Sequence, residues 1–129
     1  MKPWYRRCCM RSNLPVLTFD LAMRQLTVQQ LHALMEVAPD ARPRLLDVRE
    51  PWEFQLARID GSELVPMQQI PDKVEALDRS HPTVVICHHG TRSLQVVAFL
   101  ERMGFNNLHN LQGGIDAWAR QVDTRVALY

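Results

Sequence analysis

Residues 83–93 have the sequence TVVICHHGTRS. The β-branched run at 83–87 is typical of a buried strand, with Cys87 as its last residue. The next four residues, HHGT, contain a glycine and favour a tight loop. From 92 to 103 apolar residues recur on one helical face, and a glycine follows. The stretch therefore predicts a strand, a loop and a helix, the repeating unit of a parallel α/β sheet.

The same alternation continues on both sides of this stretch. Apolar runs bounded by turn residues predict further strands at 45–48, 64–65 and 107–111. Helical periodicity, a capping hydroxyl or an initial proline predicts helices after Thr27 and ending before Pro39, from Pro51, over 71–79, and from 113 to 118. Strands that alternate with helices over this length predict a parallel sheet with helices on both faces.

The composition is that of one ordinary globular domain. The chain has 129 residues, of which 47% are hydrophobic and 22% are charged. A chain of this size folds without disulfides or metals, and no apolar run approaches the ~20 residues of a membrane-spanning helix. Residues 1–11 carry four basic residues and no acid, whereas the remainder has eleven basic and fourteen acidic residues. Since the body is slightly acidic, we do not expect nucleic acid as a partner. Since no apolar run is long enough to span a membrane, we do not expect a membrane as a partner either.

The first 22 residues fit no secondary structure well. We expect residues 1–22 to be a basic, disordered extension and residues 23–129 to form the domain. Targeting and contact with a membrane surface are the alternatives for the extension. Three cysteines are an odd number, and Cys8 and Cys9 are adjacent, which argues against a secreted disulfide framework. A reducing compartment is therefore favoured, and we expect a cytoplasmic protein.

Cys87 lies where sites gather in open parallel sheets, beyond the carboxyl end of a strand and before a helix. The N–H groups of such a loop and the helix dipole favour a thiolate, and Arg92 adds a charge that can bind an oxyanion. The alternative is an inert, buried cysteine, beside which the polar residues HHGTR would be unnecessary. Histidines at 81, 88 and 89 also suggest a metal site, but adjacent residues rarely converge on one ion. We expect no metal and no cofactor.

Four blocks occur in order along the chain: LLDVREPWEF at 45–54, IDGSELVP at 59–66, VVICHHGTRS at 84–93 and FLERMGFNNLHNLQGGIDAW at 99–118. Together they resemble the rhodanese domain family, which is also found as single-domain thiosulfate sulfurtransferases. The resemblance runs from about Leu26 to Trp118. It implies an α/β fold, a three-layer α/β/α sandwich around a mainly parallel five-stranded sheet, with the nucleophile in the loop after a central strand.

Position by position, the resemblance implies that Cys87 is the catalytic residue that carries sulfur. The residues that match the active-site loop, and are implied to bind the substrate, are His88, His89, Gly90, Thr91 and Arg92. Those that match a block supporting structure around the site are Asp47 and Arg49. Those that match a closing block of turn and packing residues are Gly113, Gly114 and Trp118. Arg58 departs from the pattern, since many relatives have histidine there, at a position we interpret as structural.

The resemblance implies a sulfurtransferase that forms a persulfide on Cys87. Its donor would be a small sulfur-containing anion such as thiosulfate, held by Arg92, and its acceptor a thiol or cyanide, with a protein donor or acceptor also open. A phosphatase or arsenate reductase on the same fold needs the longer loop C-x5-R, whereas Cys87 and Arg92 form C-x4-R. A non-catalytic binding or regulatory module is the other alternative; its usual sign is loss of the cysteine, which this chain retains.

Overall fold

The computed structural model describes residues 25–37, 40 and 42–129. The predicted extension at 1–22 lies outside these residues. Within them, one sheet has the strand order β1-β5-β4-β2-β3, and every pairing is parallel. The strands are β1 (Gln25–Leu26), β2 (Arg44–Asp47), β3 (Glu63–Leu64), β4 (Thr83–Ile86) and β5 (Leu108–Leu111).

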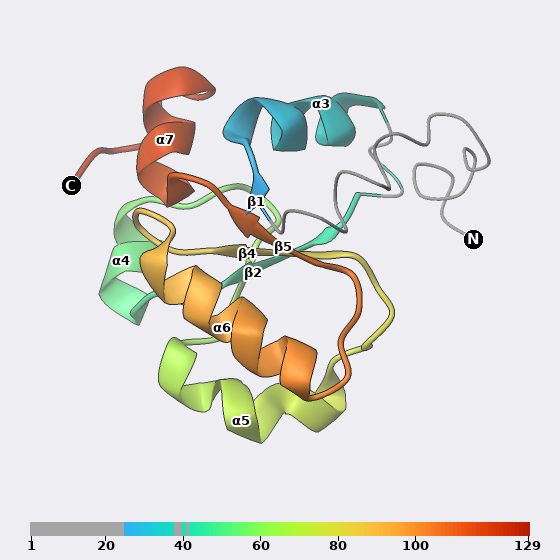
Figure 1. Cartoon of the computed structure of the whole chain (residues 1–129). Coiled ribbons are helices and arrows are strands. Elements are labelled where there is room, and N and C mark those ends of the chain that lie inside the picture. Colours follow the sequence, from blue (N-terminus) through green and yellow to red (C-terminus); the bar gives the residue numbers. More distant parts are fainter. Residues whose placement is uncertain (1–24, 38–39, 41) are drawn as a thin grey trace.

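Helices cover both faces of this sheet (Figure 1). They are α3 (Val28–Val37), α4 (Pro51–Leu56), α5 (Ile70–Lys73), α6 (Thr91–Arg102) and α7 (Gly114–Gln121). Helices α3 and α7 lie on one face, and α5 and α6 lie on the other. The predicted fold class, an α/β/α sandwich, is confirmed, and the sheet of the described residues is parallel throughout rather than mainly parallel. No helix in the described part of the chain is long and apolar enough to cross a membrane.

Alternation along the central strands divides the apolar core into two halves. Val84 of β4 belongs to the cluster formed with α3 and α7, whereas Val85 belongs to the cluster formed with α5 and α6. Leu45 and Leu46 of β2 divide in the same way. Successive side chains of a strand point to opposite faces, so a strand covered on both faces is apolar at every position. This is why β4 could be recognised as a continuous β-branched run.

The parallel arrangement brings the start of three helices to one edge of the sheet. Strands β2, β4 and β5 lie side by side in the sheet with β4 in the middle. Each is followed along the chain by a helix: α4, α6 and α7 respectively. Since parallel strands share a direction, the loops after these three strands meet beyond their carboxyl ends. Cys87 lies in the middle loop of the three.

Strands β2, β4 and β5 agree with the sequence predictions to within one residue, and the following elements differ from them. Strand β1 was not predicted, because it has two residues and exists through its pairing with β5. Strand β3 begins one residue earlier than predicted. The helix predicted over 71–79 is the short α5 between two 3₁₀ turns, η2 (Met67–Gln69) and η3 (Val74–Ala76). The helical stretch as a whole ends before Leu77, which adopts an extended conformation, while Ile70 and Val74 belong to the apolar cluster on this face of the sheet.

Candidate active site

Cys87 directly follows β4 and exposes 1% of its surface. The backbone N–H of Gly90 donates a hydrogen bond to the Cys87 Sγ at 3.0 Å, and the Ser93 hydroxyl lies 3.3 Å from the same sulfur. Gly90 adopts a left-handed conformation with φ of +103°, which allows the chain to turn back over the sulfur before α6 begins. Burial alone would suit an inert cysteine, but a backbone N–H that donates to the sulfur is a contact that stabilises a thiolate.

The carbonyl groups of the cysteine loop point to the N-terminus of α7. The Ile115 N–H donates to the Cys87 carbonyl at 2.9 Å, and the Asp116 N–H donates to the His88 carbonyl at 3.1 Å. A side chain at Gly114 would collide with both carbonyls, so a glycine is required there. In a trans peptide the N–H points opposite to the preceding C=O. Helix α7 therefore orients the N–H groups that follow these carbonyls away from itself, which leaves the loop with a donor-rich side.

A buried polar group on β5 supports the loop from the other side. The Asn110 side chain accepts a short hydrogen bond from the Ser93 hydroxyl, and its amide donates to the Gly90 carbonyl at 3.2 Å and to Gln25 at 3.0 Å. Ser93 has one hydroxyl hydrogen, so it donates to the sulfur only when its bond to Asn110 is released. Ser93 belongs to the predicted loop segment but was given no role, and Asn110 was not predicted to take part in the site. The available signal was a polar residue inside a predicted buried strand.

Arg92 is held by a carboxylate from another loop. Its guanidinium donates two hydrogen bonds to Glu53 of α4, each 2.9 Å long, and Glu53 exposes 3% of its surface. The hydrogen bonds from Arg92 lower the pKa of Glu53 to about 2, outweighing its burial. The same bonds raise the pKa of Arg92. The sequence analysis assigned Arg92 to the substrate and missed Glu53, whose position in the capping box of α4 was the available signal.

Asp47 and Arg49 form a second ion pair, which has no exposed surface. The Arg49 guanidinium donates to both Asp47 carboxylate oxygens, at 2.8 Å and 2.7 Å, and to the Ala57 carbonyl at 2.5 Å. A further bond of 2.7 Å joins Arg49 to the Tyr129 hydroxyl. The pair thus connects the end of β2, the end of α4 and the C-terminal segment of the described chain.

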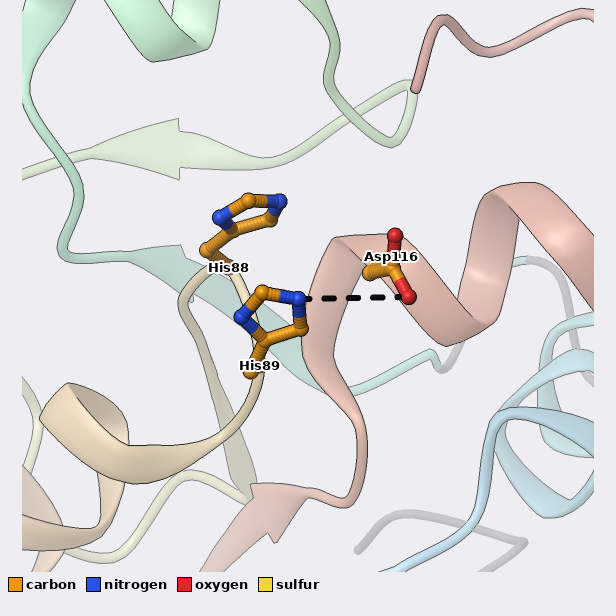
Figure 2. A group of neighbouring side chains, drawn as sticks. All are labelled: His88, His89 and Asp116. Carbon is orange, nitrogen blue, oxygen red and sulfur yellow. Dashed lines mark ion pairs between the residues drawn. The ribbon is translucent and has the colours of Figure 1, made fainter. Parts of the chain in front are cut away.

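His88 and His89 stack on each other at the mouth of the loop, with ring centroids 3.9 Å apart (Figure 2). Burial is the main cause that lowers the pKa of His88, and its buried Nε2 atom has no hydrogen-bond partner. His89 faces Asp116 of α7 at 4.0 Å, as Figure 2 shows. Thr91, the remaining loop residue, is exposed at the start of α6.

Three side chains at this loop, His88, His89 and Asp116, are of types that bind metal ions. The ligand atoms of His88, His89 and Asp116 lie within 4.8 Å of one another. The lone pairs of an imidazole lie in the plane of the ring, so two rings stacked 28° from parallel direct them side by side and not at one ion. Asp116 also accepts a hydrogen bond from Arg120 at 3.0 Å. These observations describe a polar rim of the loop, in which Asp116 is held by Arg120.

The fold and the site define a class: parallel α/β domains in which a cysteine after a central strand lies in a loop of backbone donors ahead of a helix. The sequence pattern of the rhodanese-like domain matches residues 27–121, and the chain belongs to that family.

Relatives of known sequence and structure agree with this membership. The chain is 32% identical over 95 residues to the thiosulfate sulfurtransferase GlpE of Stutzerimonas stutzeri, covering 74% of this chain and 84% of that protein. It is 34% identical over 122 residues to rhodanese-like/PpiC domain-containing protein 12, chloroplastic, of Arabidopsis thaliana, and spans 90% of this chain but 40% of that protein. The crystal structure of a rhodanese-related protein from Thermoplasma volcanium superimposes with a TM-score of 0.68 at 31% identity, covering 82% of this chain and 99% of that one.

Proposed function

We propose that this protein is a sulfurtransferase that carries a sulfane sulfur as a persulfide on Cys87. The observation that carries the proposal is the hydrogen bond of 3.0 Å from the Gly90 N–H to the Cys87 sulfur, in a loop whose carbonyls are held by α7. A site for anionic sulfur needs such donors, oriented before the reaction. The name of the relative from Stutzerimonas stutzeri, a thiosulfate sulfurtransferase, supports the same activity.

In the first step the Cys87 thiolate attacks the outer sulfur of thiosulfate. A bond forms between the two sulfur atoms, the sulfur–sulfur bond of thiosulfate breaks, and its electron pair leaves with sulfite. The product on the protein is a persulfide whose terminal sulfur carries the negative charge. Backbone N–H groups on the donor-rich side of the loop stabilise that charge.

In the second step an acceptor removes the outer sulfur. Cyanide attacks it, the persulfide bond breaks, and the electron pair returns to Cys87 as a thiolate while thiocyanate leaves. A thiol acceptor, deprotonated as a thiolate, takes the sulfur in the same way and becomes a persulfide. The transfer needs no cofactor, because both half-reactions conserve the electrons of the sulfur atoms. A protein could serve as donor or acceptor by the same chemistry.

Arg92 and the two histidines shape the donor site. Glu53 uses two N–H groups of the Arg92 guanidinium, which has five, so the others can bind the sulfonate oxygens of thiosulfate. The unpaired Nε2 of His88 is a second polar group that a substrate oxygen or a water would satisfy. Because Cys87 exposes 1% of its surface, thiosulfate reaches the sulfur only when neighbouring side chains move aside.

A mass measurement tests the proposal. The protein, with Cys8 and Cys9 replaced by serine so that one thiol remains, is incubated with thiosulfate. We expect one added sulfur on the peptide that contains Cys87, removable by cyanide or dithiothreitol and absent from the Cys87→Ala variant. Absence of the adduct in the protein with Cys87 intact would contradict the proposal.

The alternative functions predict other results. A phosphatase would hydrolyse an aryl phosphate and form no persulfide, which the C-x4-R spacing disfavours. A binding module would retain its cellular role in the Cys87→Ser variant. Loss of that role together with loss of sulfur transfer is the outcome expected for the enzyme.

A further inference from the structure

The C-terminal segment of the described chain, residues 122–129, ends against the cysteine loop. It leaves α7 on the side of the molecule where α4 lies (Figure 1). Val122, Val126 and Tyr129 pack against the apolar cluster of α3 and α7. The rhodanese-like pattern ends at residue 121, so membership of the family does not account for the contacts of this segment.

The Tyr129 hydroxyl lies between the two ion pairs of the site. It accepts a hydrogen bond from Arg49 at 2.7 Å and donates one to Glu53 at 2.9 Å. Burial raises the pKa of Tyr129 to about 12, so the hydroxyl stays protonated and can donate its hydrogen bond to Glu53. Glu53 in turn holds the guanidinium of Arg92 with both carboxylate oxygens. The hydroxyl therefore restrains the carboxylate that sets the direction of Arg92.

The Tyr129 ring covers the histidine that follows the nucleophile. It stacks on the His88 imidazole with centroids 4.0 Å apart and planes 6° from parallel. Trp52 of α4 lies edge-on to the Tyr129 ring, with ring centroids 5.8 Å apart. A stacked partner restricts rotation of the imidazole and shields one of its faces from water. The Tyr129 side chain thus contacts His88 directly and Arg92 through Glu53, and these two residues form the donor site.

We propose that Tyr129 is a positioning residue of the sulfur-transfer site, which sets the direction of Arg92 through Glu53 and fixes the imidazole of His88 by stacking. The inference rests on the proposed function for its kinetic consequences, but its geometric consequences can be measured without sulfur transfer. The ligand whose binding it governs is the anionic donor, since Arg92 and His88 are the groups that face its oxygens.

Three variants separate the two contacts from general damage. Tyr129→Phe removes the hydroxyl and keeps the ring, whereas Tyr129→Leu removes both and keeps an apolar anchor. Leu128→Ala is the matched control, because Leu128 is the preceding residue of the same segment, is also large, and is 52% exposed. All variants are made in the full chain with Cys8 and Cys9 replaced by serine, so that Cys87 is the single thiol.

The first measurement compares alkylation of Cys87 by iodoacetate and by iodoacetamide. Arg92 favours the anionic reagent, so the ratio of the two rates reports the direction of its guanidinium and needs no sulfur donor. We expect Tyr129→Phe and Tyr129→Leu to lower this ratio by about threefold to tenfold, the size expected for one hydrogen bond, and Leu128→Ala to leave it unchanged. For thiosulfate, the same variants should raise KM by a similar factor with kcat within about twofold.

The second measurement follows the His88 ring by NMR. The stacked Tyr129 ring shifts its proton resonances, so we expect Tyr129→Phe to preserve the shift and Tyr129→Leu to remove it. Exposure to water in Tyr129→Leu should also raise the pKa of His88 toward its ordinary value, since burial is the main cause of its depression. The charged or titratable groups that act on His88 are His89, Asp116 and Glu53, and all three are retained in these variants. A hydrogen bond with the Tyr129 backbone also raises the pKa of His88, and the substitutions leave that backbone group in place.

The outcomes distinguish this inference from the proposed function. If the protein forms no persulfide but the alkylation ratio and the His88 resonances change as expected, the function is wrong and the positioning role stands. If persulfide forms while both Tyr129 variants match Leu128→Ala in the ratio, in KM and in the His88 resonances, the positioning role is wrong. The temperature of unfolding shows whether Tyr129→Leu is folded. If it is not, Tyr129→Phe alone decides the role of the hydroxyl.

Discussion

The pair of Asp47 with Arg49 and the pair of Glu53 with Arg92 have the same chemistry and different surroundings. Both are arginine–carboxylate pairs with two hydrogen bonds of 2.7–2.9 Å. The first joins residues two positions apart and has no exposed side-chain surface. The second joins residues 39 positions apart, and its arginine side chain is 35% exposed. The buried pair has nothing left to offer a ligand, whereas the partly exposed pair retains donors at the mouth of the cysteine loop.

The contrast teaches how one kind of contact serves two purposes in a small domain. A buried charge without its partner is costly, so the first pair stabilises the corner between β2 and α4. The second pair lies between α4 and α6, so it aligns two helices that begin at the site. A guanidinium that is held by a carboxylate and still reaches solvent is oriented before an anion arrives.

Breaking the buried pair should have the largest effect. We expect Arg49→Met to lower the free energy of unfolding by about 3–5 kcal/mol, because Asp47 would remain as an unpaired buried charge. The measurement is chemical denaturation, with the slope of the transition checked for two-state behaviour. A loss below about 1 kcal/mol would show that water enters the corner and that the burial of this pair matters less than its geometry suggests.

Breaking the partly exposed pair should affect function more than stability. We expect Arg92→Met to raise KM for thiosulfate about tenfold or more, the scale of charge-assisted hydrogen bonds, and to lower the free energy of unfolding by about 1–2 kcal/mol. Glu53 keeps two other donors, the Tyr129 hydroxyl and the Glu50 N–H, which limits the loss of stability. A stability loss as large as that of Arg49→Met would remove the distinction between the two pairs.

The pH dependence of stability should identify the second pair. The pKa of Glu53 is lowered from 4.5 to about 2 in the folded protein, so its ionised form contributes stability above about pH 4.5. That contribution is lost as the pH falls from about 4.5 to about 2, because the unfolded chain takes up the proton first. We expect the difference in unfolding free energy between the wild type and Glu53→Gln to shrink from about pH 6 to about pH 3. A difference that is constant with pH would show that the contribution of Glu53 does not depend on its charge.

The smallest effect is expected for a third pair, Arg125 with Asp123, which provides the control for the other two. Its distance is 2.9 Å, but the Arg125 side chain is 90% exposed. We expect Arg125→Met to leave the free energy of unfolding unchanged within the error of the measurement, because water screens an exposed pair. Denaturation under the conditions used for Arg49→Met makes the comparison direct. A large loss here would mean that hydrogen-bond geometry, and not burial, ranks the three pairs.

Much of the fold could be predicted because its main signals are local. The β-branched run at 83–87 predicted a buried strand, and β4 confirmed it to within one residue. Strand β1 could not be predicted, since a two-residue strand with one apolar position has no periodicity and depends on pairing with β5. The helix over 71–79 was predicted too long for a related reason. Packing against the sheet, and not helical propensity, decided where α5 ends.

The candidate site was predictable in its loop and not in its support. Cys87 and the polar residues after it are contiguous, so their arrangement around a strand end follows from the chain itself. Glu53 and Asn110 come from other elements, 39 positions from Arg92 and 17 from Ser93 respectively. Tyr129 gave no signal at all. Its contact with Glu53 spans 76 positions, and its contact with Arg49 spans 80.

By itself, the sequence determined the class of fold, the position of Cys87 at the end of a strand and the length of the loop that follows it. These depend on which residues follow one another, through β-branching, glycine placement and helix starts. Only the tertiary structure decided which carboxylate holds Arg92, which helix orients the loop carbonyls and which ring covers His88. Those choices depend on distances between segments remote in the chain. Such contacts form only when the sheet and its helices pack together, so a local pattern of residues does not predict them.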